Sequence, residues 1–200
     1  MYGGYFTDVE GIKVGHASDI EGGTGLTIIL PDPVNTAGVD VRGGAPGTRE
    51  TDLLNPLNQV SEVSSIILSG GSAYGLEAAS HLMKILEKEK IGFDVGVGIV
   101  PIISQAVLFD LAYKNPKARP DEKMTKKAFE SATYEDKSMG IVGAGTGATV
   151  AKALGPAYLM KSGLGQASIR KGNLVVSAIV AVNAFGDIFD YHKGIQFQVP

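Results

Sequence analysis

Two polar side chains have types and sequence surroundings that would suit a role in catalysis. Asn183 follows the uncharged apolar run 174–182, and a carboxamide at the end of a buried strand needs hydrogen-bond partners. It is therefore either a structural hydrogen-bonding residue or a donor to an oxyanion. Lys152 follows the glycine-rich run 140–151. A lone lysine is ordinarily a solvated charge, so residue type alone leaves both roles open.

The run Ser69-Gly70-Gly71-Ser72 lies between a short apolar stretch and a helical pattern. The first turn of a helix has unpaired N–H groups and the positive end of the dipole, so this run could bind an anion or a developing oxyanion. The alternative is a tight strand-to-helix turn. The sequence supports either reading.

The glycine-rich segment 140–152 contains Gly143, Gly145 and Ala148 in the spacing G-x-G-x-x-A. A dinucleotide site also needs a βαβ unit and an acidic residue about 20 positions further on. Residues 166–172 contain no Asp or Glu, and no Gly-Lys-Ser or Gly-Lys-Thr follows the glycines. We therefore expect no nucleotide cofactor.

Metal and serine-triad chemistry have little support in the sequence. The three histidines, His16, His81 and His192, are far apart and lack zinc-ligand spacing, and the chain has no cysteine. No G-x-S-x-G elbow is present. We expect no metal site and no Ser-His-Asp triad.

Composition indicates a globular chain of 200 residues, 44% hydrophobic, with a mean hydropathy of +0.12, and we treat residues 1–200 as a single domain. A net charge of -3 with scattered Lys and Arg argues against nucleic-acid binding. The longest uncharged apolar stretch is shorter than the roughly 20 residues of a membrane-spanning helix. With no cationic leader at the N-terminus and no cysteine, we expect a cytoplasmic protein without a membrane partner.

Short alternating runs bounded by Gly and Pro predict strands within 11–40. A long loop is expected over 43–56, and a strand over 64–68. Apolar residues at helical spacing then predict a helix that begins with Ser72 as its N-cap and ends before Gly92.

A second helix is expected from Pro120, with Asp121 and Glu122 in its first turn. Further strand patterns occur at 93–103, 140–151, 165–170 and 174–185, whereas 106–113 is ambiguous. The uncharged run 174–182 resembles a central strand covered on both faces. Strands, then helices, then strands, without a regular βαβ rhythm, predict an α+β fold.

The sequence predicts a turn at 192–194, followed by an apolar strand pattern over 194–200. A strand without a partner suggests that another chain, or a continuation of this one, completes the sheet.

Several runs together resemble the D-aminopeptidase and β-aminopeptidase family, including its nylon-oligomer (6-aminohexanoate-oligomer) hydrolase branch. They are Val14-Gly15-His16, Gly38-Val39-Asp40-Val41-Arg42-Gly43-Gly44-Ala45, Leu68-Ser69-Gly70-Gly71-Ser72-Ala73-Tyr74-Gly75-Leu76-Glu77-Ala78, Ala106-Val107-Leu108-Phe109-Asp110, Gly143-Ala144-Gly145-Thr146-Gly147, and Asn183 with Gly186. The second and third of these runs are the most specific, and the similarity spans nearly the whole chain.

The resemblance implies an αββα layered sandwich of the N-terminal-nucleophile type, made as a precursor that cuts itself into a larger α and a smaller β chain. A Thr or Ser at the new β N-terminus would be the nucleophile, with its own α-amine as the base. This chain would be the α portion. It lacks the nucleophile, because the family's cleavage site lies beyond residue 200.

The resemblance also implies site residues. Asn183 matches the family's active-site asparagine, and Lys152 matches the lysine of the nylon-oligomer hydrolase branch. Phe109 stands where a tyrosine is usual, so a phenolic hydroxyl is absent. The expected substrate-binding residues are Val107, Phe109, Gly70, Gly71 and Ser72.

The function that follows is hydrolysis of amide or ester bonds in small peptides or amides, with a β chain from the same precursor and a homo-oligomer of αβ units as partners. An acyltransferase of the ornithine acetyltransferase type is the alternative enzyme. A truncated, non-catalytic member of the fold is the alternative of another class.

Overall fold

A five-stranded mixed sheet lies at the centre of the chain, in a computed structural model that describes residues 3–153 and 155–196. Its strand order is β1-β2-β4-β7-β3. The strands are β1 (Ile12–Asp19), β2 (Thr24–Pro31), β3 (Thr48–Arg49), β4 (Ser65–Ser69) and β7 (Ile103–Val107). Among the described strands of this sheet, the one parallel pair is β4 with β7, so the carboxyl ends of these two strands lie side by side.

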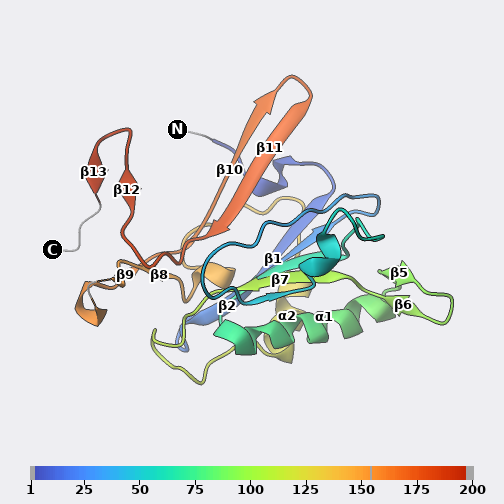
Figure 1. Cartoon of the computed structure of the whole chain (residues 1–200), viewed down its shortest axis with the longest axis horizontal. Helices are drawn as coiled ribbons and strands as arrows, with labels where there is room; N and C mark the ends of the chain where they lie inside the picture. Colours follow the sequence, from blue (N-terminus) through green and yellow to red (C-terminus); the bar gives the residue numbers. More distant parts are fainter. Residues whose placement is uncertain (1–2, 154, 197–200) are drawn as a thin grey trace.

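Two helices cover one face of this sheet, α1 (Glu77–Lys88) and α2 (Glu122–Glu130), as Figure 1 shows. Every second residue of a strand points to the same face, which gathers apolar side chains under the helices. The resulting core contains Ala17, Leu26, Ile28, Ile67, Ala78, Ala79, Leu82, Leu86, Ile103 and Ala128. This packed core of sheet and helices supports the loops at the carboxyl ends of β4 and β7.

Four two-stranded hairpins extend from this centre. They are β5 (Phe93–Asp94) with β6 (Ile99–Val100), β8 (Thr149–Val150) with β9 (Met160–Lys161), β10 (Leu164–Lys171) with β11 (Leu174–Ala181), and β12 (Phe189–Asp190) with β13 (Ile195–Gln196). In Figure 1 the β10–β11 hairpin rises on the side of the sheet opposite α1 and α2. Short 3-10 turns connect these elements: η1 (Phe6–Asp8), η2 (Asp52–Leu54), η3 (Ser72–Leu76), η4 (Gly143–Gly145) and η5 (Pro156–Tyr158).

The predicted α+β class is confirmed, and both predicted helices are present. The N-cap assignment of Ser72 was wrong. Gly71, with φ 87°, is the N-cap of η3, and Ser72 itself has φ 53° and makes no side-chain cap. The helix α1 begins only after η3, with Leu76 at its N-cap position. The second helix begins as expected, because the Asp121 side chain accepts a hydrogen bond from the N–H of Met124 at 2.8 Å.

Three strand predictions need correction. Within 140–151 only β8 is a strand, and the rest is a turn with η4. The 93–103 pattern is the β5–β6 hairpin followed by the start of β7. The run 174–182 forms β11 at the edge of a two-stranded hairpin, where alternate residues are exposed, so within the described residues it is not covered on both faces.

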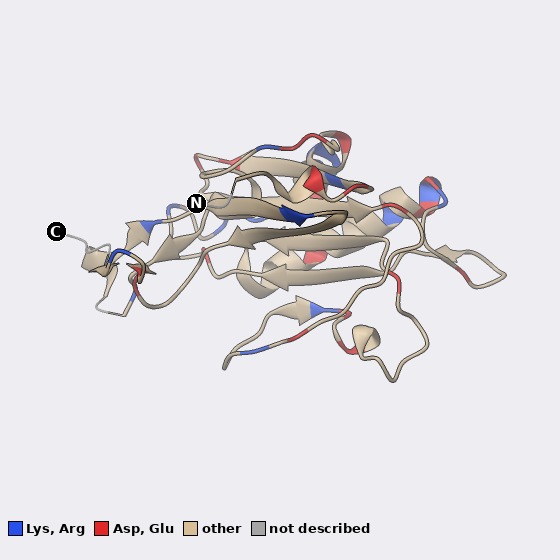
Figure 2. Ribbon diagram, turned by 90° about the horizontal axis from the view of Figure 1, so that it is seen from above, with Lys and Arg blue, Asp and Glu red and all other residues tan. Residues whose placement is uncertain are grey.

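The turn predicted at 192–194 joins β12 to β13, which begins the strand expected there. Positions 197–200 of that prediction lie outside the described residues. None of the helices in the described ranges is long and apolar enough to cross a membrane. In Figure 2 the Lys and Arg residues are dispersed among Asp and Glu rather than gathered in one stripe.

A buried polar cluster ties β1 to β10 on the face away from the helices. Nε2 of His16 lies 3.2 Å from Oδ2 of Asp136, whose side chain is 5% exposed. The same carboxylate accepts hydrogen bonds from Nε2 of Gln166 at 3.0 Å and from the N–H of Ser138 at 3.2 Å. Burial raises the pKa of Asp136, but His16, Ser138 and Gln166 outweigh it and hold the pKa at about 2.

We expect this carboxylate to make the fold acid-sensitive. Because its folded pKa lies below the unfolded value of 3.8, Asp136 stabilises the fold above about pH 4, and this contribution is lost as the pH falls toward 2. The loss should be about 2 kcal/mol. Urea unfolding at pH 5 and pH 2.5 measures this loss. In Asp136→Asn, the difference between the unfolding free energies at the two pH values should be smaller by that amount. Asp94→Asn, on the exposed β5, is the matched substitution outside the buried cluster.

Candidate active site

Lys152 and Asn183 lie side by side beyond the ends of β8 and β11. Nζ of Lys152 donates to Oδ1 of Asn183 at 2.8 Å and to the main-chain oxygen of Asn183 at 3.1 Å. The N–H of Thr149 also donates to Oδ1, at 3.0 Å. Two donors on one atom identify that atom as the carboxamide oxygen, so the amide nitrogen Nδ2 must point the other way.

The outward nitrogen faces the loop that follows β7. Nδ2 of Asn183 donates to the main-chain oxygen of Phe109 at 3.2 Å. An amide nitrogen carries two hydrogens, so its second N–H can still donate to a substrate oxygen. The arrangement therefore presents one oriented, neutral donor beside a cation, which is the chemistry that stabilises a developing oxyanion.

Main-chain pairing holds the two residues in register. The N–H of Ala151 donates to the oxygen of Gly186 at 2.9 Å, and the N–H of Lys152 donates to the oxygen of Phe185 at 2.8 Å. Ala151 adopts φ 59°, a left-handed conformation that is costly for a residue with a side chain. This turn of the backbone comes immediately before Lys152. Burial lowers the pKa of Lys152.

The loop that carries Phe109 is anchored by a buried carboxylate, Asp110, which is 4% exposed. Its Oδ1 accepts from the N–H of Gly71 at 2.7 Å, and its Oδ2 accepts from the hydroxyl of Thr24 at 2.7 Å. Burial raises the pKa of Asp110, and this outweighs the lowering effect of those two donors. A Cβ at Gly70 or Gly147 would lie within 2.4 Å of Oδ2, so both glycines make room for this carboxylate.

The N–H groups of the Ser69–Ser72 turn are already paired within the chain. Gly70 donates to the oxygen of Gly25 at 2.8 Å, Gly71 donates to Asp110, and Ser72 donates to the oxygen of Leu108 at 3.1 Å. This geometry favours the tight-turn interpretation over an anion site. Gly70, Gly71 and Ser72 support the Phe109 loop from behind.

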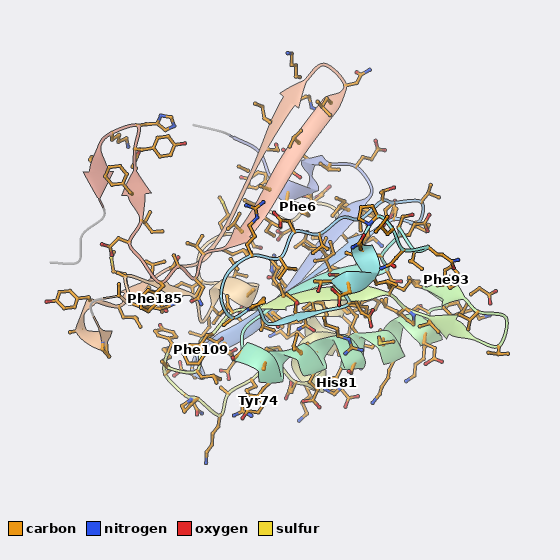
Figure 3. All side chains as sticks on the ribbon, in the orientation of Figure 1. Phe6, Tyr74, His81, Phe93, Phe109 and Phe185 are labelled. Carbon is orange, nitrogen blue, oxygen red and sulfur yellow. The ribbon has the colours of Figure 1, made fainter. Side chains whose placement is uncertain are left out.

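An apolar pocket of about 370 Å³ opens beside Lys152. It is lined by Phe109, Asp110, Ala112, Tyr113, Thr149, Lys152, Gly155, Pro156, Leu159 and Phe185. In Figure 3, Phe109 and Phe185 lie in the left half of the molecule and Phe93 on the right. A pocket of this size and composition fits a small, mostly apolar ligand.

The glycine segment that leads to this site has a packing role. A Cβ at Gly143 would lie 2.2 Å from the hydroxyl of Thr27, and one at Gly145 would lie 2.2 Å from the main-chain nitrogen of Leu164. The N–H groups of Gly143 and Ala144 donate to the hydroxyls of Ser18 and Thr27. The spacing that resembles a dinucleotide fingerprint therefore reflects a backbone threaded tightly against β2 and β10.

A second lysine, Lys161, fixes the same turn from the other side. Its Nζ donates to the main-chain oxygens of Gly145, Ala148 and Ser162 at 2.8, 2.9 and 2.6 Å. Burial, and next the charge of Lys114, lower the pKa of Lys161 to about 8, so it remains a cation at neutral pH. No sequence pattern marks this residue, because its partners are main-chain oxygens.

The structure thus brings Lys152, Asn183 and Phe109 together. Val107 is not among the residues that line the pocket, and its side chain lies against Gly47, where a Cβ would be 2.5 Å from it. The pocket residues Tyr113, Leu159 and Phe185 were not predicted. They come from irregular segments, where no periodic pattern marks which side chains converge.

The fold matches a known architecture. The chain superposes with a TM-score of 0.73 on an L-aminopeptidase D-Ala-esterase/amidase from Ochrobactrum anthropi, covering 93% of this chain and 55% of that one at 20% identity. That enzyme is described as a new variant among the Ntn hydrolase fold. The predicted N-terminal-nucleophile type of fold is therefore confirmed.

The sequence places the chain more narrowly. A family model for Peptidase family S58 matches residues 5–196, and the chain belongs to this family. It is 38% identical to an uncharacterized aminopeptidase of Mycobacterium leprae over 94% of this chain and 55% of the relative. It is 33% identical to a 6-aminohexanoate-oligomer endohydrolase of Kocuria sp. over 94% of this chain and 50% of the relative. The chain spans about half the length of these relatives.

Proposed function

We propose that the chain is the α portion of a self-cleaving amide-bond hydrolase, with residues 1–200 as one unit. The nucleophile would be a Thr or Ser at the N-terminus of a β chain from the same precursor. The observation that carries the proposal is the Lys152–Asn183 pair, oriented by two donors on Oδ1 and opening on an apolar pocket. The names of the relatives, an aminopeptidase and an oligomer endohydrolase, support an amide substrate.

The proposed chemistry combines this pair with the nucleophile of the β chain. The hydroxyl of the nucleophile attacks the substrate carbonyl while its own α-amine accepts the hydroxyl proton. Negative charge develops on the carbonyl oxygen, to which the free N–H of Asn183 donates. The ammonium of Lys152 keeps Oδ1 occupied, so the carboxamide stays oriented, and its charge stabilises the oxyanion. The α-amine then returns the proton to the leaving amine, and water hydrolyses the acyl-enzyme.

The test uses the full-length protein purified under native conditions. Intact-mass measurement should find two chains, the second on the order of 100 residues and beginning with Thr or Ser, and the preparation should release amine from a small amide. A single unprocessed species that hydrolyses amides would contradict the self-cleavage. If the acyl group passes to an amine acceptor in preference to water, the acyltransferase alternative is correct.

The assembly is part of the same proposal. Closed symmetric oligomers are common for soluble enzymes, so we expect more than one αβ unit in the particle. Light scattering on the processed preparation gives its mass.

A further inference from the structure

A single peptide unit links Lys161 to Asn183. The main-chain oxygen of Ala148 accepts a hydrogen bond from Nζ of Lys161 at 2.9 Å. The N–H of Thr149 donates to Oδ1 of Asn183 at 3.0 Å. This carbonyl and this N–H belong to the same planar trans peptide unit, so they point in opposite directions. A rotation of the unit would therefore weaken both hydrogen bonds at once.

Lys161 is placed to prevent such a rotation. β9 pairs with β8 so that Lys161 lies opposite Thr149. The oxygen of Ala148 also accepts from the N–H of Ser162 at 3.0 Å. Nζ of Lys161 reaches two further main-chain oxygens, those of Gly145 and Ser162, at 2.8 and 2.6 Å. An ammonium group has three N–H donors, so each of the three oxygens can receive one of them.

The charge of Lys161 adds to this geometry. A cation on a carbonyl oxygen polarises the peptide unit, so the N–H of the same unit becomes a stronger donor. The unit is shielded from water, since Ala148 and Thr149 are 0% and 2% exposed. With Oδ1 of Asn183 held by the N–H of Thr149, Nδ2 stays turned toward the oxygen of Phe109.

We infer that Lys161 is a positioning residue for Asn183, because its ammonium fixes the peptide unit that orients the carboxamide. This inference rests on the proposed function and deepens it, and the contacts that carry it lie within this chain. In this role Lys161 does not touch the substrate. Its loss should therefore lower kcat per folded molecule and change KM little.

The protonation state of Lys161 makes this role dependent on pH. Burial, and next the charge of Lys114, lower the pKa of Lys161 to about 8. The neutral amine has two N–H donors for three oxygens and no longer polarises the peptide unit. The value of kcat should therefore fall as the pH rises through about 8.

Other ionisable groups lie around the same turn. Nζ of Lys161 is 5.6 Å from the ring centre of Tyr113, and Nζ of Lys114 is 5.8 Å from the same ring. Asp110 lies on the other side of the turn, where a Cβ at Gly147 would be 2.4 Å from its Oδ2. Both oxygens of Asp110 already accept hydrogen bonds within the chain.

Lys152, which also donates to Asn183, is the group whose titration must be distinguished from that of Lys161. Burial lowers the pKa of Lys152, whereas burial and the charge of Lys114 lower that of Lys161. Removing the charge of Lys114 should therefore raise the pKa of Lys161 and leave the titration of Lys152 in place.

The first experiment measures steady-state kinetics of the processed full-length protein with alanine p-nitroanilide, or with the small amide that the parent cleaves best. At pH 7 we expect Lys161→Met to lower kcat by about tenfold, less than loss of the oxyanion donor itself, and to change KM by less than about twofold. Lys114→Met is the matched control, because its Nζ donates to a main-chain oxygen outside the turn, that of Ile20, at 2.6 Å. Its kcat at pH 7 should stay within about twofold of the parent value.

A double variant tests whether Lys161 acts through Asn183. In the Asn183→Ala background, Lys161→Met should have little further effect on kcat, because the group that it positions is already absent. An equal, roughly tenfold loss in both backgrounds would mean that Lys161 acts independently of Asn183, and it would overturn this inference.

The pH profile is a test that needs no substitution at Lys161. The kcat of the parent should fall above about pH 8. Lys114→Met should move this fall upward by about half a pH unit, because it removes a repelling charge. Lys117→Met, on the same loop, is the matched control, and circular dichroism verifies the folded state at each pH. A missing fall, a fall that Lys114→Met leaves in place, or equal shifts in both variants would overturn this inference.

The outcomes separate this inference from the proposed function. Normal kcat in folded, processed Lys161→Met overturns the positioning role and leaves amide hydrolysis intact. Failure of the parent to cleave any small amide overturns the proposed function, and this inference with it. If Lys161→Met does not mature, the pH profiles of the parent and of Lys114→Met decide.

Discussion

Asn183→Ala is expected to lower kcat of the processed full-length protein by about two to three orders of magnitude, the range for loss of one oxyanion donor. The reason lies in the orientation of the carboxamide, whose Oδ1 is held by Lys152 and Thr149 and whose Nδ2 has one N–H free. KM should change less than kcat, because the donor acts most strongly in the transition state. Steady-state kinetics per folded molecule measure this.

Asn35 provides a matched control, because it is an asparagine that pairs only with main-chain groups. Its Nδ2 donates to the oxygens of Asp32 and Val63, and its Oδ1 accepts from the N–H of Val63. Asn35→Ala should cost about 1 to 3 kcal/mol of stability and leave turnover per folded molecule unchanged. If Asn183→Ala behaves like Asn35→Ala, with a stability loss and normal turnover, the oxyanion role is wrong.

The same donor should assist self-cleavage of the precursor, which has an equivalent tetrahedral intermediate. Asn183→Ala precursor should therefore process more slowly, as followed by the appearance of the two chains. Normal processing together with normal turnover would assign Asn183 to structure alone.

The elements that could be predicted from sequence are those whose packing partner is local and regular. In β2, Leu26 and Ile28 are fully buried under the helices, and the polar Thr27 is fully buried on the other face, where its hydroxyl bonds to His16 and Ala144. The period-2 pattern therefore predicted which face is apolar and which is polar, although both faces are buried. In α1, Leu82 and Leu86 are fully buried at a spacing of four residues. Periodicity predicts structure when the apolar residues of a helix or strand recur on the same face along its length.

The errors arise where that condition fails. Residues 174–182 are apolar on both sides, a pattern that normally marks a central strand, yet Val176 and Val180 are 54% and 51% exposed on β11. In the proposed particle, a second chain would cover that face. Segment 140–151 is apolar and glycine-rich because it threads between strands, and apolar composition alone does not distinguish this from a strand.

The site itself could not be derived from spacing. Lys152 and Asn183 are 31 positions apart and meet at 2.8 Å, and Asn183 meets Phe109 across 74 positions. Both contacts depend on loops whose geometry is set by buried main-chain partners. The resemblance to a family, and not their spacing, identified Lys152 and Asn183 as candidates. The tight-turn interpretation of Ser69–Ser72 required the acceptors of its N–H groups, which only the structure provides.

Gly145→Ala is expected to destabilise the fold by about 3 kcal/mol, at the upper end of the cost of overpacking. A Cβ at this position would lie 2.2 Å from the main-chain nitrogen of Leu164 and 2.7 Å from the oxygen of Gly140. Both atoms belong to main chain that is mutually hydrogen-bonded between Gly140 and Leu164, so neither can move aside without breaking that pair. Chemical unfolding of the purified protein measures the loss.

Gly165→Ala, twenty positions along the chain, is the matched control. A Cβ there meets no atom within 4 Å, so the same added methyl group should change stability by less than about 0.5 kcal/mol. The substitution at Gly145 should also lower activity. The main-chain oxygen of Gly145 accepts a hydrogen bond from Lys161, and the N–H of Thr149, four residues further on, donates to Asn183. A Gly145→Ala protein that folds should therefore turn over more slowly even under conditions where it is fully native. Equal stability and equal turnover in the two alanine variants would show that the glycine spacing has no packing role, and would reopen a ligand-binding explanation for it.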